Sequence, residues 1–168
     1  MKTRQLLCLL LAAALCLCLC GCGEKDPLAG LTQYHHSCGV SIKMAKGYSE
    51  NNVDGLSIFD GENSAVRMER ETFETLATVG YDGAAMTEAD YAELIIAAYG
   101  LDGSPATDEY GSTYLLYTMP VSGADVNYYA FYYKTADSFW TVTFMCVASE
   151  AEQFESDYHL WASTVEIG

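Results

Sequence analysis

The stretch NYYAFYYKTADSFWTVTFMCVASEAEQFESDYHLWASTVEI, residues 127–167, decides the fold. Its middle part, residues 139–148, alternates between two faces, which predicts a half-buried β-strand. One face carries Trp140, Val142, Phe144 and Cys146, and the other carries Thr141 and Thr143. Residues 126–134 predict the preceding strand, and TADS provides the turn between the two. We therefore expect an antiparallel pair at this point of the chain.

A closing helix is predicted after that pair. Ser149 and Glu152 have the spacing of a capping box, in which each side chain bonds the backbone of the other residue. An apolar stripe follows at intervals of three and four residues, formed by Phe154, Tyr158, Trp161 and Val165. We expect this stripe to pack on the sheet.

Toward the N-terminus, more strands and one clear helix are predicted. Strands are expected at residues 38–44, with Cys38, Val40, Ile42 and Met44 inward, and at 53–59, 64–69 and 113–120. Residues 47–52 and DGEN at 60–63 read as turns. Residues 70–77 indicate a short helix. A longer helix begins after the N-cap Thr87 and ends at Gly100, with Tyr91, Leu94, Ile95 and Ala98 as its apolar stripe.

Together these elements predict an α+β domain over residues 37–168. Its core is a mainly antiparallel sheet of about six strands, packed with two to three helices. The entry strand CGVSIKMAKGY, the helix TEADYAELIIAAYG and the 127–167 block resemble the PsbP-like superfamily, which includes DcrB-like bacterial lipoproteins. The resemblance implies a PsbP-like sandwich and a non-catalytic accessory or binding role, and it carries over no catalytic residues.

The N-terminal segment has the layout of a secretory signal peptide. Lys2 and Arg4 form a positive region, and an uncharged apolar run follows. The run ends in Leu19-Cys20-Gly21-Cys22, which resembles the lipobox of bacterial lipoproteins. This resemblance implies cleavage after residue 21 and a diacylglyceryl group on Cys22. An ordinary secretory signal is the alternative. Residues 22–36 are interpreted as a flexible tether.

Loss of residues 1–21 leaves six basic residues against 23 acidic ones, a net charge of about −17. Such a chain repels nucleic acid and anionic lipid headgroups, so a nucleic-acid partner is excluded. The expected location is the outer side of a cell membrane, with the lipid on Cys22 as the membrane contact and an envelope protein as a candidate partner.

Cys38 and Cys146 are the two cysteines that follow the lipobox. An exported protein can retain a disulfide between them, and two buried free thiols are the alternative. His35, His36 and Cys38 contain metal-binding atoms, but exposed polar residues before a strand explain them better, so neither a metal nor a cofactor is expected.

Thirteen tyrosines make aromatic surface the most informative candidate site. Tyr128 and Tyr132 fall on one face of their strand, and Tyr129 and Tyr133 fall on the other. One of these faces could form a platform for a partner or an apolar ligand. Cross-strand packing under helices is the alternative.

Sequence motifs for catalysis are absent: there is no G-x-S-x-G, H-E-x-x-H, Walker A or G-x-G-x-x-G. We therefore expect a non-catalytic, lipid-anchored binding or accessory module. The alternative is a small-ligand or metal-binding lipoprotein that serves a transporter, and a hydrolase with an unrecognised site comes last.

Overall fold

The computed structural model describes residues 26–53 and 55–168. The predicted signal peptide, Cys22 and the first part of the predicted tether lie outside this range. The described elements are β1 (Thr32–His35), β2 (Val40–Met44), β3 (Ser49–Val53), β4 (Leu56–Asp60), β5 (Ser64–Thr72), α2 (Phe73–Thr78), α3 (Glu88–Tyr99), β6 (Ala106–Thr107), β7 (Thr113–Val121), β8 (Ala124–Lys134), β9 (Ser138–Val147), the 3₁₀ turn η1 (Ala148–Glu150), α4 (Ala151–Ala162) and β10 (Glu166–Ile167).

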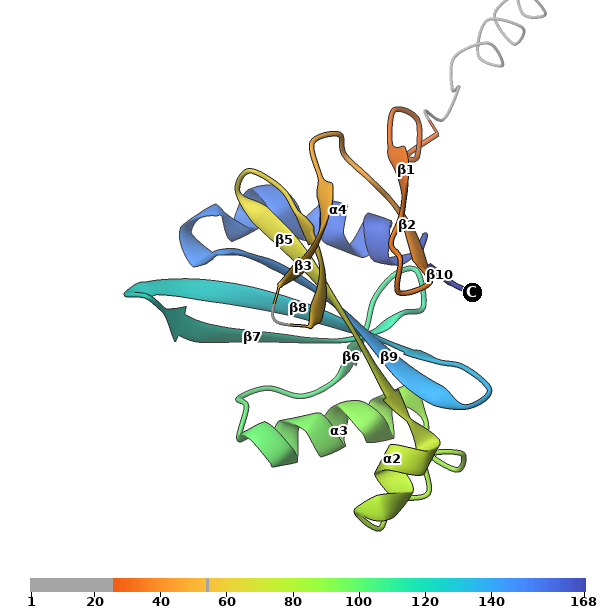
Figure 1. Ribbon diagram of the computed structural model, residues 1–168. Helices are drawn as coiled ribbons and strands as arrows, with labels where there is room; N and C mark the ends of the chain where they lie inside the picture. The colour runs from red at the N-terminus through yellow and green to blue at the C-terminus, as the bar shows by residue number, and fades with distance from the viewer. Residues whose placement is uncertain (1–25, 54) are drawn as a thin grey trace, which may run out of the picture.

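A seven-stranded antiparallel sheet forms the centre of the molecule, in the order β3-β4-β5-β9-β8-β7-β6 (Figure 1). β9 lies between β5 and β8, and Val142 is the partner of both Met68 and Phe131. Val142 and Phe144 are fully buried, as the alternation predicted. The α+β class and the antiparallel sheet are therefore confirmed, although the strands outnumber the six expected.

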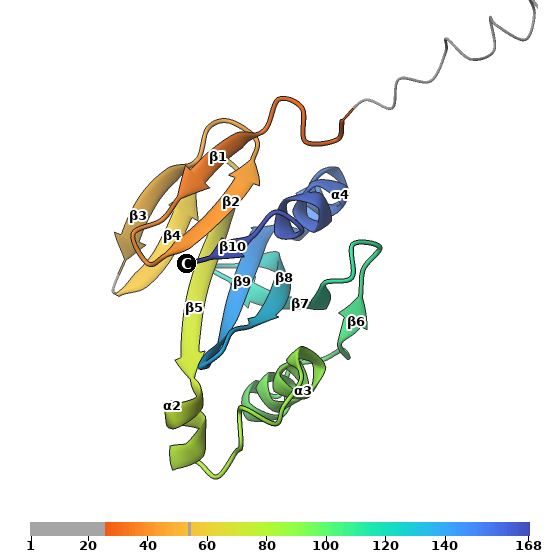
Figure 2. The same ribbon diagram turned by 90° about the vertical axis from the view of Figure 1, so that its right-hand side faces the viewer.

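One face of this sheet is covered by α4 and by a three-stranded sheet in the order β1-β2-β10 (Figure 2). Val40, Ile42 and Met44 of β2 are fully buried against it, as predicted. From α4, Tyr158 and Trp161 enter the same cluster. Cys38 lies in the turn before β2, outside the strand in which it was predicted.

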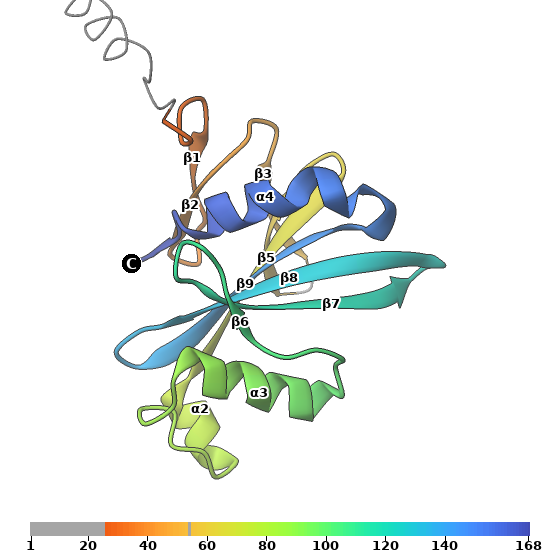
Figure 3. The ribbon, with the colours of Figure 1, turned by 180° about the vertical axis from the view of Figure 1, so that it is seen from behind.

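The opposite face carries α2 and α3, so the two helical layers lie on different sides of the sheet (Figure 3). The predicted capping box of α3 is confirmed. The Asp90 backbone N–H donates to Thr87 Oγ1 over 3.2 Å, and the Thr87 backbone N–H donates to Asp90 Oδ2 over 2.9 Å. Gly100 ends the helix with φ of 62°, a left-handed conformation that glycine adopts without strain.

Several sequence-based boundaries were wrong. β1 occupies residues assigned to the tether, and β3 with its partner β4 replaces a turn and one longer strand. β5 continues to Thr72, so α2 is shorter than predicted.

Two helix details also differ from the prediction. Ser149 lies inside η1, and the helix α4 begins without a side-chain cap, so the predicted Ser149–Glu152 capping box is wrong. Ala98 is exposed, whereas the other three residues of the predicted α3 stripe, Tyr91, Leu94 and Ile95, pack into the cluster on this face of the sheet.

Candidate functional site

A hollow of about 570 Å³ lies on the α3 side of the seven-stranded sheet. We call it the α3 groove. Its sheet side consists of residues from β5, β9, β8 and β7, and its other side consists of residues from α3 and the start of α2. α3 packs on β7 and β8, whereas β9 and β5 form the continuing floor.

Small side chains make the floor hollow. Ala130 on β8 and Thr143 on β9 are direct partners in the sheet, and both are buried. Thr141, two residues before Thr143 in β9, lies on the same face and also lines the groove. Short side chains between long ones leave space above the strands, so the groove follows from the sequence of β8 and β9.

Aromatic side chains form the walls. Tyr117 and Tyr128, from β7 and β8, stack at 4.9 Å between ring centroids with an interplanar angle of 3°. At the other end, Tyr91 of α3 stacks on Phe139 at 4.4 Å and meets the Tyr132 ring edge-on at 5.8 Å. These flat surfaces suit an apolar or aromatic molecule.

Unsatisfied polar atoms concentrate in the same place. Within the described part of the chain, four buried side-chain nitrogen or oxygen atoms have no hydrogen-bond partner, and three of them belong to residues that line the α3 groove. These three are Arg67 Nε, Tyr132 Oη and Thr143 Oγ1; the fourth is Trp161 Nε1. Burying a polar group without a partner costs about 1–3 kcal/mol. Such a cluster is consistent with a site whose partner comes from outside.

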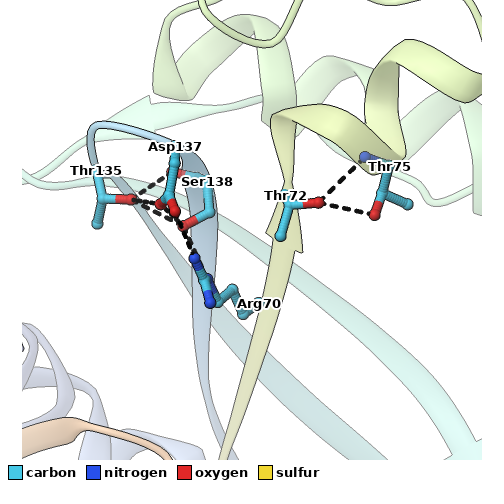
Figure 4. Close-up of polar contacts among 6 residues, drawn as sticks. All are labelled: Arg70, Thr72, Thr75, Thr135, Asp137 and Ser138. Atoms are coloured by element: carbon cyan, nitrogen blue, oxygen red, sulfur yellow. Dashed lines mark hydrogen bonds and ion pairs between the residues drawn. The ribbon is translucent and has the colours of Figure 1, made fainter.

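The charges beside the groove are mostly paired. Arg67 Nη2 lies 3.0 Å from Glu69 Oε2, and Tyr91 Oη donates to Glu71 Oε2 over 2.8 Å. Arg70 turns toward the β8–β9 turn, where its Nη2 lies 2.7 Å from Asp137 Oδ2 (Figure 4).

Asp137 is held as a carboxylate in that turn. The Ser138 hydroxyl and then Arg70 hold the pKa of Asp137 below its usual range. Arg70 also donates from Nε to Ser138 Oγ over 3.0 Å, and Thr72 beside it caps α2 by accepting from the Thr75 backbone N–H (Figure 4). The positive charge of Arg70 is therefore already used outside the groove.

Tyr132 and Tyr117 of the groove keep their protons at neutral pH. Burial, followed by the nearby Tyr117 and Glu69, raises the pKa of Tyr132 above its ordinary value. Burial also raises the pKa of Tyr117. The Tyr132 hydroxyl can therefore donate a hydrogen bond under physiological conditions.

The four tyrosines singled out from the sequence divide as the strand alternation predicted. Tyr128 and Tyr132 line the α3 groove. Tyr129 and Tyr133 face the other layer, where Tyr129 packs against Tyr158 of α4 and Tyr133 Oη donates to the Ala162 carbonyl over 2.8 Å. Arg67 and Thr143 were not selected from the sequence, because a lone arginine and a strand threonine carry no motif.

Cys38, which is half-buried, and Cys146, which is buried, are both free thiols in this structure. Cys146 is buried in β9, and burial raises the pKa of its thiol. It behaves as a small apolar side chain in the layer under α4.

The histidines have hydrogen-bonding roles. His35 Nδ1 lies 2.7 Å from Ser41 Oγ, and His36 is buried, where its Nδ1 accepts from the Cys38 backbone N–H. His159 Nδ1 lies 3.0 Å from the buried carboxylate of Asp108, a contact that the sequence did not indicate. Among the described residues, no group of three or more His, Cys, Asp or Glu side chains could hold a metal ion. No described helix is long and apolar enough to cross a membrane.

Comparison with known proteins supports the fold. No protein-family model matches the sequence, and no curated protein matches it. The structure is similar to the solution structure of cyanobacterial PsbP (CyanoP) from Synechocystis sp. PCC 6803, with a TM-score of 0.52, 15% identity, and coverage of 88% of this chain and 97% of that one. A Bacteroides thetaiotaomicron crystal structure gives a TM-score of 0.51 at 12% identity, covering 77% of this chain and 45% of that one. The fold is therefore PsbP-like.

Proposed function

We propose that this protein is a non-catalytic binding module that takes a small, largely apolar ligand in the α3 groove. The observation that carries this proposal is the coincidence of a hollow with aromatic walls and three buried polar atoms that have no partner. The volume of the α3 groove falls within the range of about 300–1,000 Å³ that is usual for small-molecule sites. Of the two binding roles expected from the sequence, the groove favours the small-ligand one. Engagement of an envelope protein stays a prediction.

The proposal includes a membrane anchor on the outer side of the membrane. Its support is the sequence Leu19-Cys20-Gly21-Cys22, which resembles a lipobox. Asp26, the first described residue, follows Cys22 by four positions, a separation of at most about 14 Å for an extended chain. Two acyl chains on one cysteine would give stable anchoring, which a single chain does not.

The groove can be tested by filling it. Full-length protein in lipid nanodiscs is titrated with a panel of single-ring aromatic fragments and followed by ligand-observed NMR, with empty nanodiscs subtracted. We expect binding to the wild type and its loss in Ala130→Leu, because the larger side chain occupies the floor beside Thr143. The matched control is Ala98→Leu, the same change at an exposed position of α3.

Two results would count against this function. Either no fragment binds the wild type, or the fragments bind Ala130→Leu as well as they bind the wild type. Circular dichroism checks that the Ala130→Leu variant is folded, because adding volume to a packed region can strain it.

A further inference from the structure

We infer that the ligand of the α3 groove carries a carbonyl-type oxygen, a hydrogen-bond acceptor, on a flat apolar body. This inference rests on the proposed function and specifies the class of ligand. Its basis is the three buried groove atoms without a hydrogen-bond partner, Arg67 Nε, Tyr132 Oη and Thr143 Oγ1.

The three atoms come from neighbouring positions of the sheet. Arg67 and Thr143 are direct partners between β5 and β9, and Thr143 is the partner of Ala130 on β8. Tyr132 lies two residues beyond Ala130 on the same face. Direct partners on one face have Cβ atoms about 4.5–5.5 Å apart, and diagonal neighbours are about 7–8 Å apart. The three side chains are therefore neighbours on the face of the sheet that lines the α3 groove.

All three unpartnered groups can donate a hydrogen bond. Arg67 Nε–H can only donate a hydrogen bond, whereas the Tyr132 and Thr143 hydroxyls can donate or accept. Tyr132 is 2% exposed and Thr143 is 0% exposed, so bulk water does not reach their hydroxyl groups freely. An acceptor oxygen is the one kind of group with which each of the three can bond.

Charge narrows the class further. An ammonium group would meet the positive charge of Arg67, which offers it no acceptor. A phosphate or other polyanion would meet Glu69 and Glu71, and Arg67 and Arg70 are already paired with Glu69 and Asp137. The net charge of −15 over the whole chain also repels polyanions. A carbonyl-type oxygen can accept hydrogen bonds from these donors without either conflict.

The rest of the ligand must be apolar and flat. The stacked pair Tyr117–Tyr128 presents ring surface on one side of the groove, and Ile95 and Leu101 line the helical side. Aromatic walls favour a ring that can stack on them or meet their edges.

Three probes with one carbon skeleton test this inference: acetophenone, ethylbenzene and 1-phenylethylammonium. Full-length protein in nanodiscs is titrated with each by ligand-observed NMR, with empty nanodiscs subtracted. We expect acetophenone to bind about 3- to 10-fold more tightly than ethylbenzene, the range expected for one or two hydrogen bonds, and the ammonium probe to bind most weakly.

Two variants identify the atoms responsible. Thr143→Val and Tyr132→Phe each remove one unpartnered hydroxyl while keeping the shape of the side chain. Each should weaken acetophenone binding severalfold and leave ethylbenzene binding unchanged. Neither should lower the melting temperature, because the lost hydroxyl bonds nothing in the free protein. Tyr129→Phe, on the opposite face of β8, is the matched control and should bind all probes as the wild type does.

The outcomes separate the two proposals. If acetophenone and ethylbenzene bind equally, or if both variants retain acetophenone binding, the acceptor inference is overturned while ligand binding in the groove stands. If none of the probes binds and the fragment panel is also negative, both proposals fail.

Discussion

Two adjacent tyrosines on β8 place their hydroxyl groups on opposite faces of the sheet, where the two groups have opposite effects on stability. Tyr133 Oη donates to the Ala162 carbonyl at the end of α4, whereas Tyr132 Oη is buried with no partner. A satisfied buried hydrogen bond stabilises a fold modestly, and an unsatisfied group destabilises it. The first hydroxyl therefore contributes to stability, and the second lowers it.

Tyr133→Phe should lower the free energy of unfolding by about 1 kcal/mol, because it leaves the Ala162 carbonyl without this donor. Tyr132→Phe should leave the free energy of unfolding unchanged or raise it by a similar amount. Urea denaturation of the two variants beside the wild type measures the difference. Equal losses in both would mean that Tyr132 Oη has a partner in the folded protein, which would also remove one support of the proposed site.

At the scale of elements, α3 forms one side of the groove, and its N-terminus depends on the capping box of Thr87 and Asp90. Thr87→Ala should lower the free energy of unfolding by about 1 kcal/mol. The matched control is Ser149→Ala, which should have no effect because Ser149 makes no capping bond. Chemical denaturation checks both, and a similar loss in the control would contradict this account of the helix ends.

The same capping box gives α3 a defined pH dependence. Hydrogen bonds from the Thr87 backbone N–H and then from its side chain lower the pKa of Asp90 below its ordinary value. The stabilisation is present above the ordinary carboxyl pKa of about 4 and is lost as the pH falls through the lowered pKa. An NMR titration of the Asp90 carboxyl carbon should give a midpoint below that of a free aspartate, and in Thr87→Ala it should move toward the ordinary value.

Elements with strong patterns could be predicted from the sequence, and elements without them could not. β9 alternates between apolar and polar residues from Trp140 to Phe144, and α3 has both an N-cap and a terminal glycine. β3, in contrast, is exposed at every residue and lies at the edge of the sheet, so its residues SENNV show no buried face. Edge strands are held by backbone pairing more than by side-chain burial, and this pairing leaves little signal in the sequence.

The candidate site was predictable to a similar extent. Strand periodicity placed Tyr128 and Tyr132 together, and the structure confirms this. It could not tell which face α3 would leave partly open. That depends on where the helix docks and on the small side chains of Ala130 and Thr143, which a sequence pattern does not distinguish from ordinary strand residues. The pairing of Arg67 with Thr143 depends on strand order, because β5 and β9 are far apart in the chain.

For the whole molecule, the two faces of the sheet are covered by different layers. β1, the first described strand after the proposed anchor, belongs to the layer that contains α4, whereas the α3 groove lies on the opposite face (Figures 1 and 2). In the proposed arrangement, a lipid on Cys22 would hold the protein from the side of the layer that contains α4. The groove would stay accessible to a ligand that arrives from outside the membrane.

Replacement of Cys22 tests the anchor directly. In cells grown with an alkyne-labelled fatty acid, the wild-type protein should carry the label and fractionate with membranes if the lipobox-like sequence directs modification to Cys22, as proposed. Cys22→Ala should lose the label. Cys20→Ala is the matched control: it changes a cysteine two residues away that would leave with the signal peptide, so the label should remain. If Cys22→Ala still carries the label, or if only Cys20→Ala loses it, Cys22 is not the modified residue and the proposed anchor is wrong. We expect the α3 groove to be unaffected in either case, since Leu31 is the first of the described residues that packs against the core on the opposite face.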